Sequence, residues 1–131
     1  LRLPIIHHPA YSGGFVSPGV SGVADYLQLG LLPRIFGADM PIFVSYGGRF
    51  TFTEEQCKRI SSYIKRPMGL MKAACPAPGG GVTDARLNEL VELYGNDTMF
   101  LVGGDMFRRG PDIEANMSYF VERLTKLSER T

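Results

Sequence analysis

What this sequence lacks excludes several classes of partner. It has 14 Lys and Arg residues against 13 Asp and Glu, a formal net charge of +1. This balance indicates no basic surface for nucleic acid or for a membrane. No apolar run approaches the roughly 18 residues that a membrane-spanning helix needs, and no signal peptide is recognisable. We therefore expect a protein that binds neither nucleic acid nor membranes.

Cysteine is also scarce. Cys57 and Cys75 are the only two cysteines, too few for a disulfide framework, which favours a reducing compartment and predicts a cytoplasmic location. With 44% hydrophobic and 21% charged residues, the 131-residue chain has the composition of an ordinary globular domain that can bury a core. The chain starts at Leu1 without a Met and enters a strand-like run almost at once. We therefore expect it to be cut from a longer protein.

Four strand-like segments, each followed by a helix-like one, make up the rest of the pattern. The predicted strands are Leu3–His8, Met40–Val44, Leu70–Ala74 and Thr98–Val102. Short strands that are apolar on both faces are typical of a parallel sheet, and parallel neighbours require helical crossovers. The sequence therefore predicts an α/β fold of four βα units, half of a (β/α)₈ barrel. A small doubly wound sheet is the alternative that spacing alone does not exclude.

Helical periodicity and capping residues place the four helices. The first is predicted over Val20–Phe36, with one apolar face made by Val20, Val23, Ala24, Leu27 and Leu31. Thr53 and Gln56 predict a capping box at the start of the second. Its predicted buried residues are Cys57, Ile60 and Ile64.

The third and fourth helices have equally recognisable ends. Thr83 is expected to cap the third, and Gly95 to end it. Pro111 is expected at the first position of the fourth helix. The predicted apolar face of that helix consists of Ile113, Met117, Phe120, Val121, Leu124 and Leu127.

Two glycine clusters stand where a strand-like segment ends and a helix begins. They are Cys75-Pro-Ala-Pro-Gly-Gly-Gly81 and Val102-Gly-Gly104. Glycine lets backbone N–H groups approach an anion closely, and a following helix N-terminus favours negative charge. Two such turns from consecutive units would form a phosphate clamp of the kind found after the last two strands of a (β/α)₈ barrel. Glycines that merely permit tight turns are the alternative. We predict that the backbone amides of Gly80, Gly81, Gly103 and Gly104 bind the phosphate of a small-molecule substrate.

Five segments, in this order and spacing, carry a resemblance to a known family. They are His8-Pro-Ala10, Gly37-Ala-Asp39, Tyr46-Gly-Gly-Arg-Phe50, Pro78-Gly-Gly-Gly81 and Phe100-Leu-Val-Gly-Gly104. The sequence resembles the RuBisCO-like proteins, form IV relatives of the large chain of ribulose-bisphosphate carboxylase. The resemblance covers essentially residues 1–131 and implies the C-terminal half of the family's catalytic barrel. Strand residues expected toward the barrel interior are Ile6, His8, Ile42 and Met99 or Phe100.

The resemblance also implies roles for individual residues. His8 matches a histidine that faces the substrate, where an imidazole can donate a hydrogen bond or relay a proton. A purely structural histidine is the alternative, and His7 is expected to face the other way because adjacent strand residues alternate. Arg49 could hold a second phosphate or a carboxylate in bidentate fashion, or simply be a solvated loop residue. Asp39 precedes a strand and is expected to be structural.

The departures from the carboxylase narrow the expected reaction. The segment Tyr46-Gly-Gly-Arg-Phe-Thr-Phe52 has no counterpart of the lysine that positions CO₂. The resemblance thus implies a longer enzyme that enolises a phosphorylated keto-sugar or sugar acid, with an isomerase, enolase or tautomerase, or decarboxylase outcome. It also implies Mg²⁺ bound by a lysine and two carboxylates of an earlier strand, which nothing in this chain matches. No cluster of oxygen ligands of the kind a hard cation needs is visible near a predicted strand end.

Taken alone, the chain is expected to bind part of the substrate without converting it. The alternative is a non-catalytic half-barrel that associates with itself, because two unpaired strand edges and an apolar interior favour association. A homodimer or higher oligomer is expected on these grounds.

Overall fold

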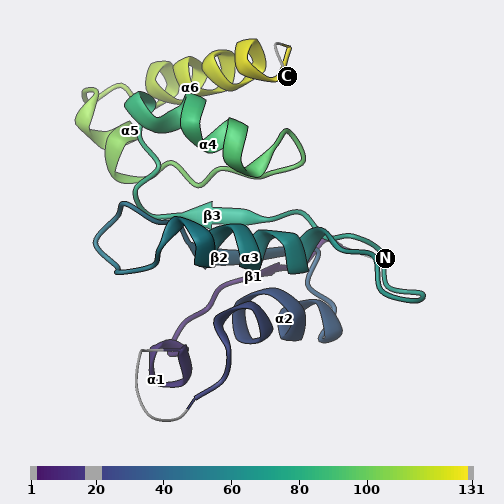
Figure 1. Cartoon of the computed structure of the whole chain (residues 1–131). Coiled ribbons are helices and arrows are strands. Elements are labelled where there is room, and N and C mark those ends of the chain that lie inside the picture. Colours follow the sequence, from purple (N-terminus) through teal and green to yellow (C-terminus); the bar gives the residue numbers. More distant parts are fainter. Residues whose placement is uncertain (1–2, 17–21, 130–131) are drawn as a thin grey trace.

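A three-stranded parallel sheet forms the centre of the molecule. The computed structural model describes residues 3–16 and 22–129. The strands are β1 (Ile6–His7), β2 (Met40–Val44) and β3 (Ala77–Gly79), and they pair in sequence order (Figure 1). Met40 lies opposite Ile6, and Ile42 lies opposite Ala77. The predicted parallel α/β arrangement is confirmed by this pairing.

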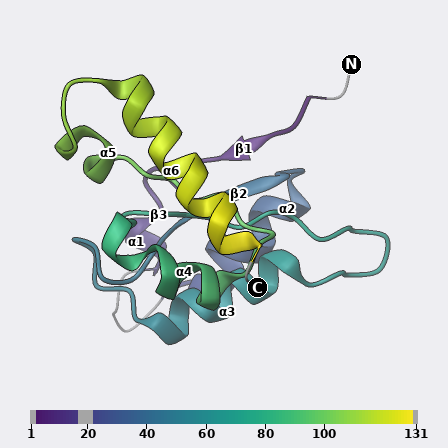
Figure 2. The same cartoon turned by 90° about the horizontal axis from the view of Figure 1, so that it is seen from above.

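The helices connect the strands and follow them. Their bounds are α1 Gly13–Val16, η1 (a π-helix) Tyr26–Leu31, α2 Leu32–Ile35, α3 Glu54–Lys65, η2 (a 3₁₀ turn) Asp84–Arg86, α4 Leu87–Tyr94, α5 Gly104–Arg108 and α6 Ile113–Ser128. No helix of the described residues is long and apolar enough to cross a membrane. Both α3 and α4 lie on the same side of the strands (Figure 2).

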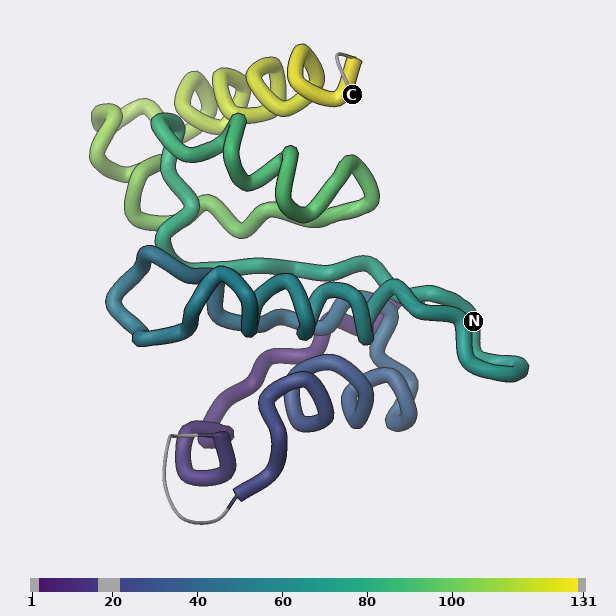
Figure 3. Tube along the Cα trace, viewed as in Figure 1, coloured from purple at the N-terminus to yellow at the C-terminus, as the bar shows by residue number. Residues whose placement is uncertain are grey.

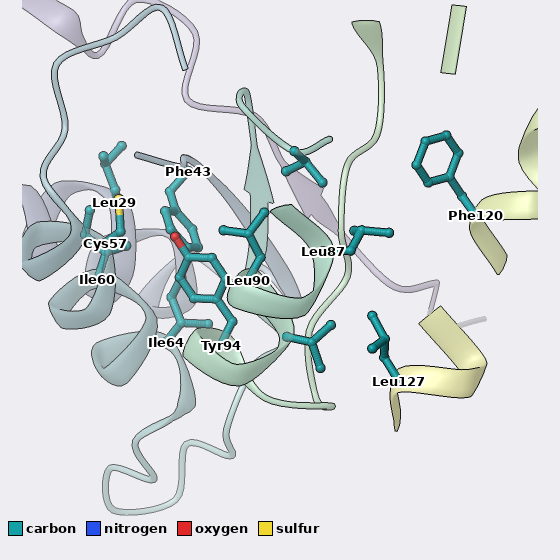
Figure 4. Packing of buried hydrophobic residues seen from close by; sticks show 12 residues of the cluster. Leu29, Phe43, Cys57, Ile60, Ile64, Leu87, Leu90, Tyr94, Phe120 and Leu127 are labelled. Carbon is teal, nitrogen blue, oxygen red and sulfur yellow. The ribbon is translucent and has the colours of Figure 1, made fainter. Parts of the chain in front are cut away.

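The hydrophobic core lies between these helices and the sheet, and Phe43 of β2 is at its centre. Phe43 is fully buried, and its ring meets that of Tyr94 edge to face at a centroid distance of 5.8 Å. Around it lie buried side chains from η1, α3 and α4 (Figure 4): Leu29, Cys57, Ile60, Ile64, Leu87, Leu90 and Tyr94. One face of the sheet is therefore covered by the helices η1, α3 and α4. The doubly wound alternative, with helices on both faces, is wrong.

The opposite face of the sheet is more open. Ile42 alternates with buried Phe43 and is only half-buried, and Ile6 on β1 is 54% exposed. Both therefore lie where the half-barrel prediction places them. Phe100 instead packs with the helical core, 6.4 Å from the ring of Tyr94. Of Met99 and Phe100, the two alternatives predicted to face the barrel interior, Phe100 therefore lies on the helical side instead.

The third predicted strand, Leu70–Ala74, is wrong by several residues. Met68 and Met71 exchange backbone hydrogen bonds of 3.1 and 2.9 Å in a tight turn, with Gly69 at a φ of +56° and Leu70 fully exposed. The guanidinium of Arg34 connects this segment to α3, since it donates hydrogen bonds to the carbonyls of Tyr63 and Lys72. An apolar run does not by itself identify a strand, because an exposed turn can contain one as well.

The fourth predicted strand, Thr98–Val102, is only partly formed. Met99 and Leu101 donate backbone hydrogen bonds of 2.9 and 3.1 Å to the carbonyls of Pro76 and Pro78. Prolines have no N–H to donate in return, so half of the expected ladder cannot form. Pairing is reduced to one parallel bridge between Gly79 and Leu101. Four regular βα units are therefore not confirmed.

The first helix also departs from its prediction. Val20 lies outside the described residues, and the helix is regular only from Tyr26, where it begins as a π-helix. Because a π-helix advances by a different number of residues per turn, the expected 3.6-residue face does not persist. Leu29 and Gly30 are buried in place of Leu27 and Leu31.

The predicted capping box is confirmed, as is the end of α4. Thr53 and Gln56 exchange hydrogen bonds of 2.9 and 3.2 Å at the start of α3, and Gly95 ends α4 with a φ of +77°. The side chain of Thr83 makes no capping hydrogen bond, because the turn η2 separates it from α4.

The start of α6 is displaced from Pro111. Asp112 is the cap, and its carboxylate accepts the N–H of Ala115 at 3.0 Å. Only part of the predicted apolar face is buried. Phe120 and Leu127 are covered, whereas the exposed members are Ile113, Met117 and Val121.

Candidate phosphate-binding site

The loops that follow the strands gather at one end of the sheet. In Figure 1 the strands run toward the left, where α1, the loop after β2 and α5 lie. The loop after β2 and the chain leaving β3 run side by side there (Figure 3). The predicted glycine residues therefore lie at the carboxyl end of a parallel sheet, where α/β proteins bind ligands.

Gly80 and Gly81 occupy a turn that requires glycine. Their φ angles are +79° and +70°, a region that residues with side chains rarely adopt. The backbone of Gly81 also packs directly on that of Gly48. A Cβ added to Gly81 would lie 2.7 Å from the amide nitrogen of Gly48. This turn thus joins two loops by backbone contact.

Gly103 and Gly104 have different surroundings. Both are exposed, and neither has a positive φ. A Cβ at Gly103 would meet no atom within 4 Å, and one at Gly104 would meet only Nη1 of Arg108 at 3.9 Å. The backbone conformation does not demand glycine here. The absent side chains leave open space beside the backbone at both positions, as an approaching anion would need.

A hydrogen bond connects the two turns. The amide of Asp84 donates to Oδ2 of Asp105 at 2.8 Å. Asp84 follows Gly81 by three residues, and Asp105 follows Gly104 directly. The carboxylate of Asp84 is held in turn by the hydroxyl of Tyr119 at 2.7 Å and by Nε of Arg123 at 3.3 Å. The Tyr119 hydrogen bond is the main reason why the pKa of Asp84 lies below its usual range.

Arg86 is a loop-joining residue that sequence reasoning missed. Its Nη1 donates to the carbonyls of Tyr46 at 2.7 Å and Gly81 at 3.0 Å, and its guanidinium lies 4.4 Å from the centroid of the Tyr46 ring. Glu89 pairs with it at 2.9 Å. No sequence signal could have revealed these bonds, because the carbonyl acceptor on Tyr46 is 40 residues away.

The phenol of Tyr46 completes this junction. It donates a hydrogen bond to the carboxylate of Glu89. Burial, followed by the effect of Glu89, raises the pKa of Tyr46 to about 12. The phenol therefore stays protonated near neutral pH and keeps its donor role.

Arg49 lies one residue beyond the Gly48–Gly81 contact. Its side chain is exposed, and its guanidinium lies 4.9 Å from the centroid of the Phe50 ring. This position directly follows Gly48, whose backbone contacts Gly81, at the end of the sheet where the ligand is expected.

His8 follows β1 directly and is exposed, whereas His7 is half-buried. Nδ1 of His7 is buried without a hydrogen-bond partner, and burial, with a smaller effect of His8, lowers its pKa. Asp39 lies at the opposite end of the sheet, where its carboxylate accepts the N–H of Ile5 at 2.8 Å. That contact gives Asp39 the structural role expected of it.

The described residues do not suit a metal ion. They contain no group of three His, Cys, Asp or Glu side chains close enough to bind one. The residues of this part of the protein therefore do not fit the Mg²⁺ ion that the resemblance implies.

Known proteins are similar to this chain in both sequence and structure. The chain is 35% identical over 118 residues to ribulose bisphosphate carboxylase-like protein 1 of Rhodopseudomonas palustris, covering 90% of this chain and 30% of that protein. Its structure superposes on a rubisco-like protein from Alicyclobacillus acidocaldarius with a TM-score of 0.86, at 28% identity, over 98% of this chain and 32% of the other. The homologues of this chain are thus RuBisCO-like proteins. The chain matches the C-terminal part of their barrel.

Other relatives have names that state an activity. The chain is 31% identical to a 5-methylthioribulose-1-phosphate isomerase of Rhodospirillum rubrum, over 86% of this chain and 30% of that protein. It is 32% identical to a 2,3-diketo-5-methylthiopentyl-1-phosphate enolase of Exiguobacterium sibiricum, over 79% of this chain and 26% of that protein. No family model matches the chain. The chain thus spans about 30% of the length of the curated relatives that it matches.

Proposed function

We propose that this chain supplies the phosphate-binding part of a RuBisCO-like enzyme that enolises a phosphorylated keto-sugar or sugar acid. The observation that supports this most strongly is the pairing of two glycine turns at the carboxyl end of one parallel sheet. One turn is fixed by positive φ angles, and the other has open space where side chains would stand. Relatives that act on 1-phosphates, an isomerase and an enolase, support the same class of substrate.

The proposed division of roles follows from charge and exposure. Backbone amides of Gly80, Gly81, Gly103 and Gly104 would hold one phosphate without a side-chain cation. Arg49 would hold a charged group at the other end of the substrate. A phosphate there would imply a bisphosphate, and a carboxylate would imply a sugar acid.

His8 would act on the reacting part of the substrate. It is exposed at the carboxyl end of β1, the end at which barrel enzymes place catalytic groups. Its imidazole could relay a proton during enolisation, while the outcome would be isomerisation, tautomerisation or decarboxylation. A Mg²⁺ ion of the complete enzyme would be held by residues outside this chain. We propose a cytoplasmic location, which the two unpaired cysteines support.

Gly104→Val is expected to abolish phosphate binding while leaving the fold intact. The added side chain would fill the open space beside the backbone through which the anion would approach, and the position has no positive φ to strain. Inorganic phosphate titrated into the ¹⁵N-labelled chain should shift the amide signals of Gly80, Gly81, Gly103 and Gly104. In the variant these shifts should disappear, with a loss of stability below about 1 kcal/mol.

Gly14→Val is the matched control. Gly14 is exposed, a Cβ there would meet no atom within 4 Å, and α1 lies on the far side of the strand ends from α5 (Figure 1). This variant should bind phosphate as well as the unsubstituted chain. Undiminished binding by Gly104→Val would contradict the proposed site.

The isolated chain is expected to associate in solution. β1 forms one edge of the sheet, and the apolar side chains of Leu3, Ile5 and Ile6 are 71%, 52% and 54% exposed. Open edges and apolar surface favour self-pairing, so light scattering should give a mass above that of one chain. A stable 14.4 kDa monomer that unfolds cooperatively would rule out this association.

A further inference from the structure

We propose that Asp105 is a positioning residue that sets the spacing between the two glycine turns. This inference rests on the proposed phosphate site and adds a side chain to a site otherwise made of backbone. Asp105 directly follows Gly104 and receives the amide of Asp84 at 2.8 Å. Each end of that hydrogen bond therefore lies within three residues of one of the turns.

Further contacts hold both partners of this hydrogen bond in place. Asp84 is fastened to α6 by Tyr119 at 2.7 Å and Arg123 at 3.3 Å. Asp105 is held by its own helix neighbour, since Nη2 of Arg108 lies 3.3 Å from Oδ1. One carboxylate thus ties α5 to the chain leaving β3. Amides that must converge on one anion depend on such a fixed separation.

A carboxylate beside an anion site would by itself weaken binding. Here Asp105 has its charge offset by the Asp84 amide and by Arg108. If the carboxylate acts through geometry, its removal weakens phosphate binding. If it acts only through charge, its removal strengthens binding. The two roles therefore predict changes of opposite sign.

Three variants of the 131-residue chain test the proposal with inorganic phosphate as the probe. Asp105→Ala removes the acceptor and should weaken phosphate binding by about tenfold, the worth of one good hydrogen bond. Asp105→Asn keeps an acceptor oxygen and should bind within about twofold of the original. Asp112→Ala removes a comparable carboxylate that caps α6, and it should leave phosphate binding unchanged although the helix loses its cap.

Hydrogen exchange of the Asp84 amide provides a readout without ligand. Exchange should be faster in Asp105→Ala than in the original chain, and unchanged in Asp105→Asn and Asp112→Ala. Phosphate binding by Asp105→Ala that equals or exceeds the original would overturn this inference and leave the phosphate site standing. Absence of phosphate-induced shifts in the unsubstituted chain would overturn the proposed function, and with it this inference.

Discussion

Gly81→Val is expected to unfold much of the chain rather than only block a ligand. Gly81 has a φ of +70°, which is strained for a β-branched residue. Its new Cβ would lie 2.7 Å from the amide nitrogen of Gly48 and 3.0 Å from the carbonyl carbon of Gly47, both backbone atoms that cannot swing away. Strain and overpacking together should cost about 3–5 kcal/mol, a large part of the stability of a domain this size.

Urea denaturation of Gly81→Val and Gly104→Val side by side measures this difference. The two substitutions add the same side chain to the two turns of one site, but only Gly81 has a positive φ and close backbone neighbours. Gly104→Val should shift the midpoint only slightly, in keeping with a loss below about 1 kcal/mol. A Gly81→Val protein as stable as the original would show that the backbone contact between the two loops is not required.

His8→Asn is expected to remove most of the activity of the complete enzyme to which this chain would belong. General acid–base groups contribute about 10²–10⁴-fold to rate, and asparagine cannot relay a proton. The loss should appear in kcat, with a smaller change in KM, because the phosphate would still be held by the glycine turns. Steady-state kinetics with a phosphorylated keto-sugar would measure both constants.

His7→Asn is the natural comparison. His7 adjoins His8 but is half-buried, and its Nδ1 has no hydrogen-bond partner. We expect this variant to retain most of the activity. Equal losses in kcat for both variants would count against a specific role for His8 and favour a structural effect on β1.

Some features of the glycine turns are predictable from the sequence, and others are not. The place of the turns between strand-like and helix-like segments was predictable, since the periodicity of such segments is local. The sequence could not distinguish the two turns, however. Only the structure shows that Gly81 needs its conformation and packs on Gly48, whereas Gly104 faces open space.

Of the strands, the sequence predicted β2 accurately and misplaced β3. Met40–Val44 was predicted with its exact bounds, because it is short, apolar and central. The third strand was placed too early, in Leu70–Ala74, because an apolar run was taken for the strand that in fact follows it at Ala77–Gly79. Pro76 and Pro78 are buried, and their carbonyls accept hydrogen bonds from the next segment. An edge without N–H donors is acceptable there because the fourth segment pairs by donation alone.

The sequence by itself determined the features that depend on residues a few positions apart: the capping box at Thr53 and the end of α4 at Gly95. Tertiary structure alone decided which loops meet. Arg86 finds the carbonyl of Tyr46, and the amide of Asp84 finds the carboxylate of Asp105, across 40 and 21 residues of chain. The reason is physical. A cap is selected by the backbone beside it, whereas the acceptor for a distant donor exists only once the parallel strands have brought their carboxyl ends together.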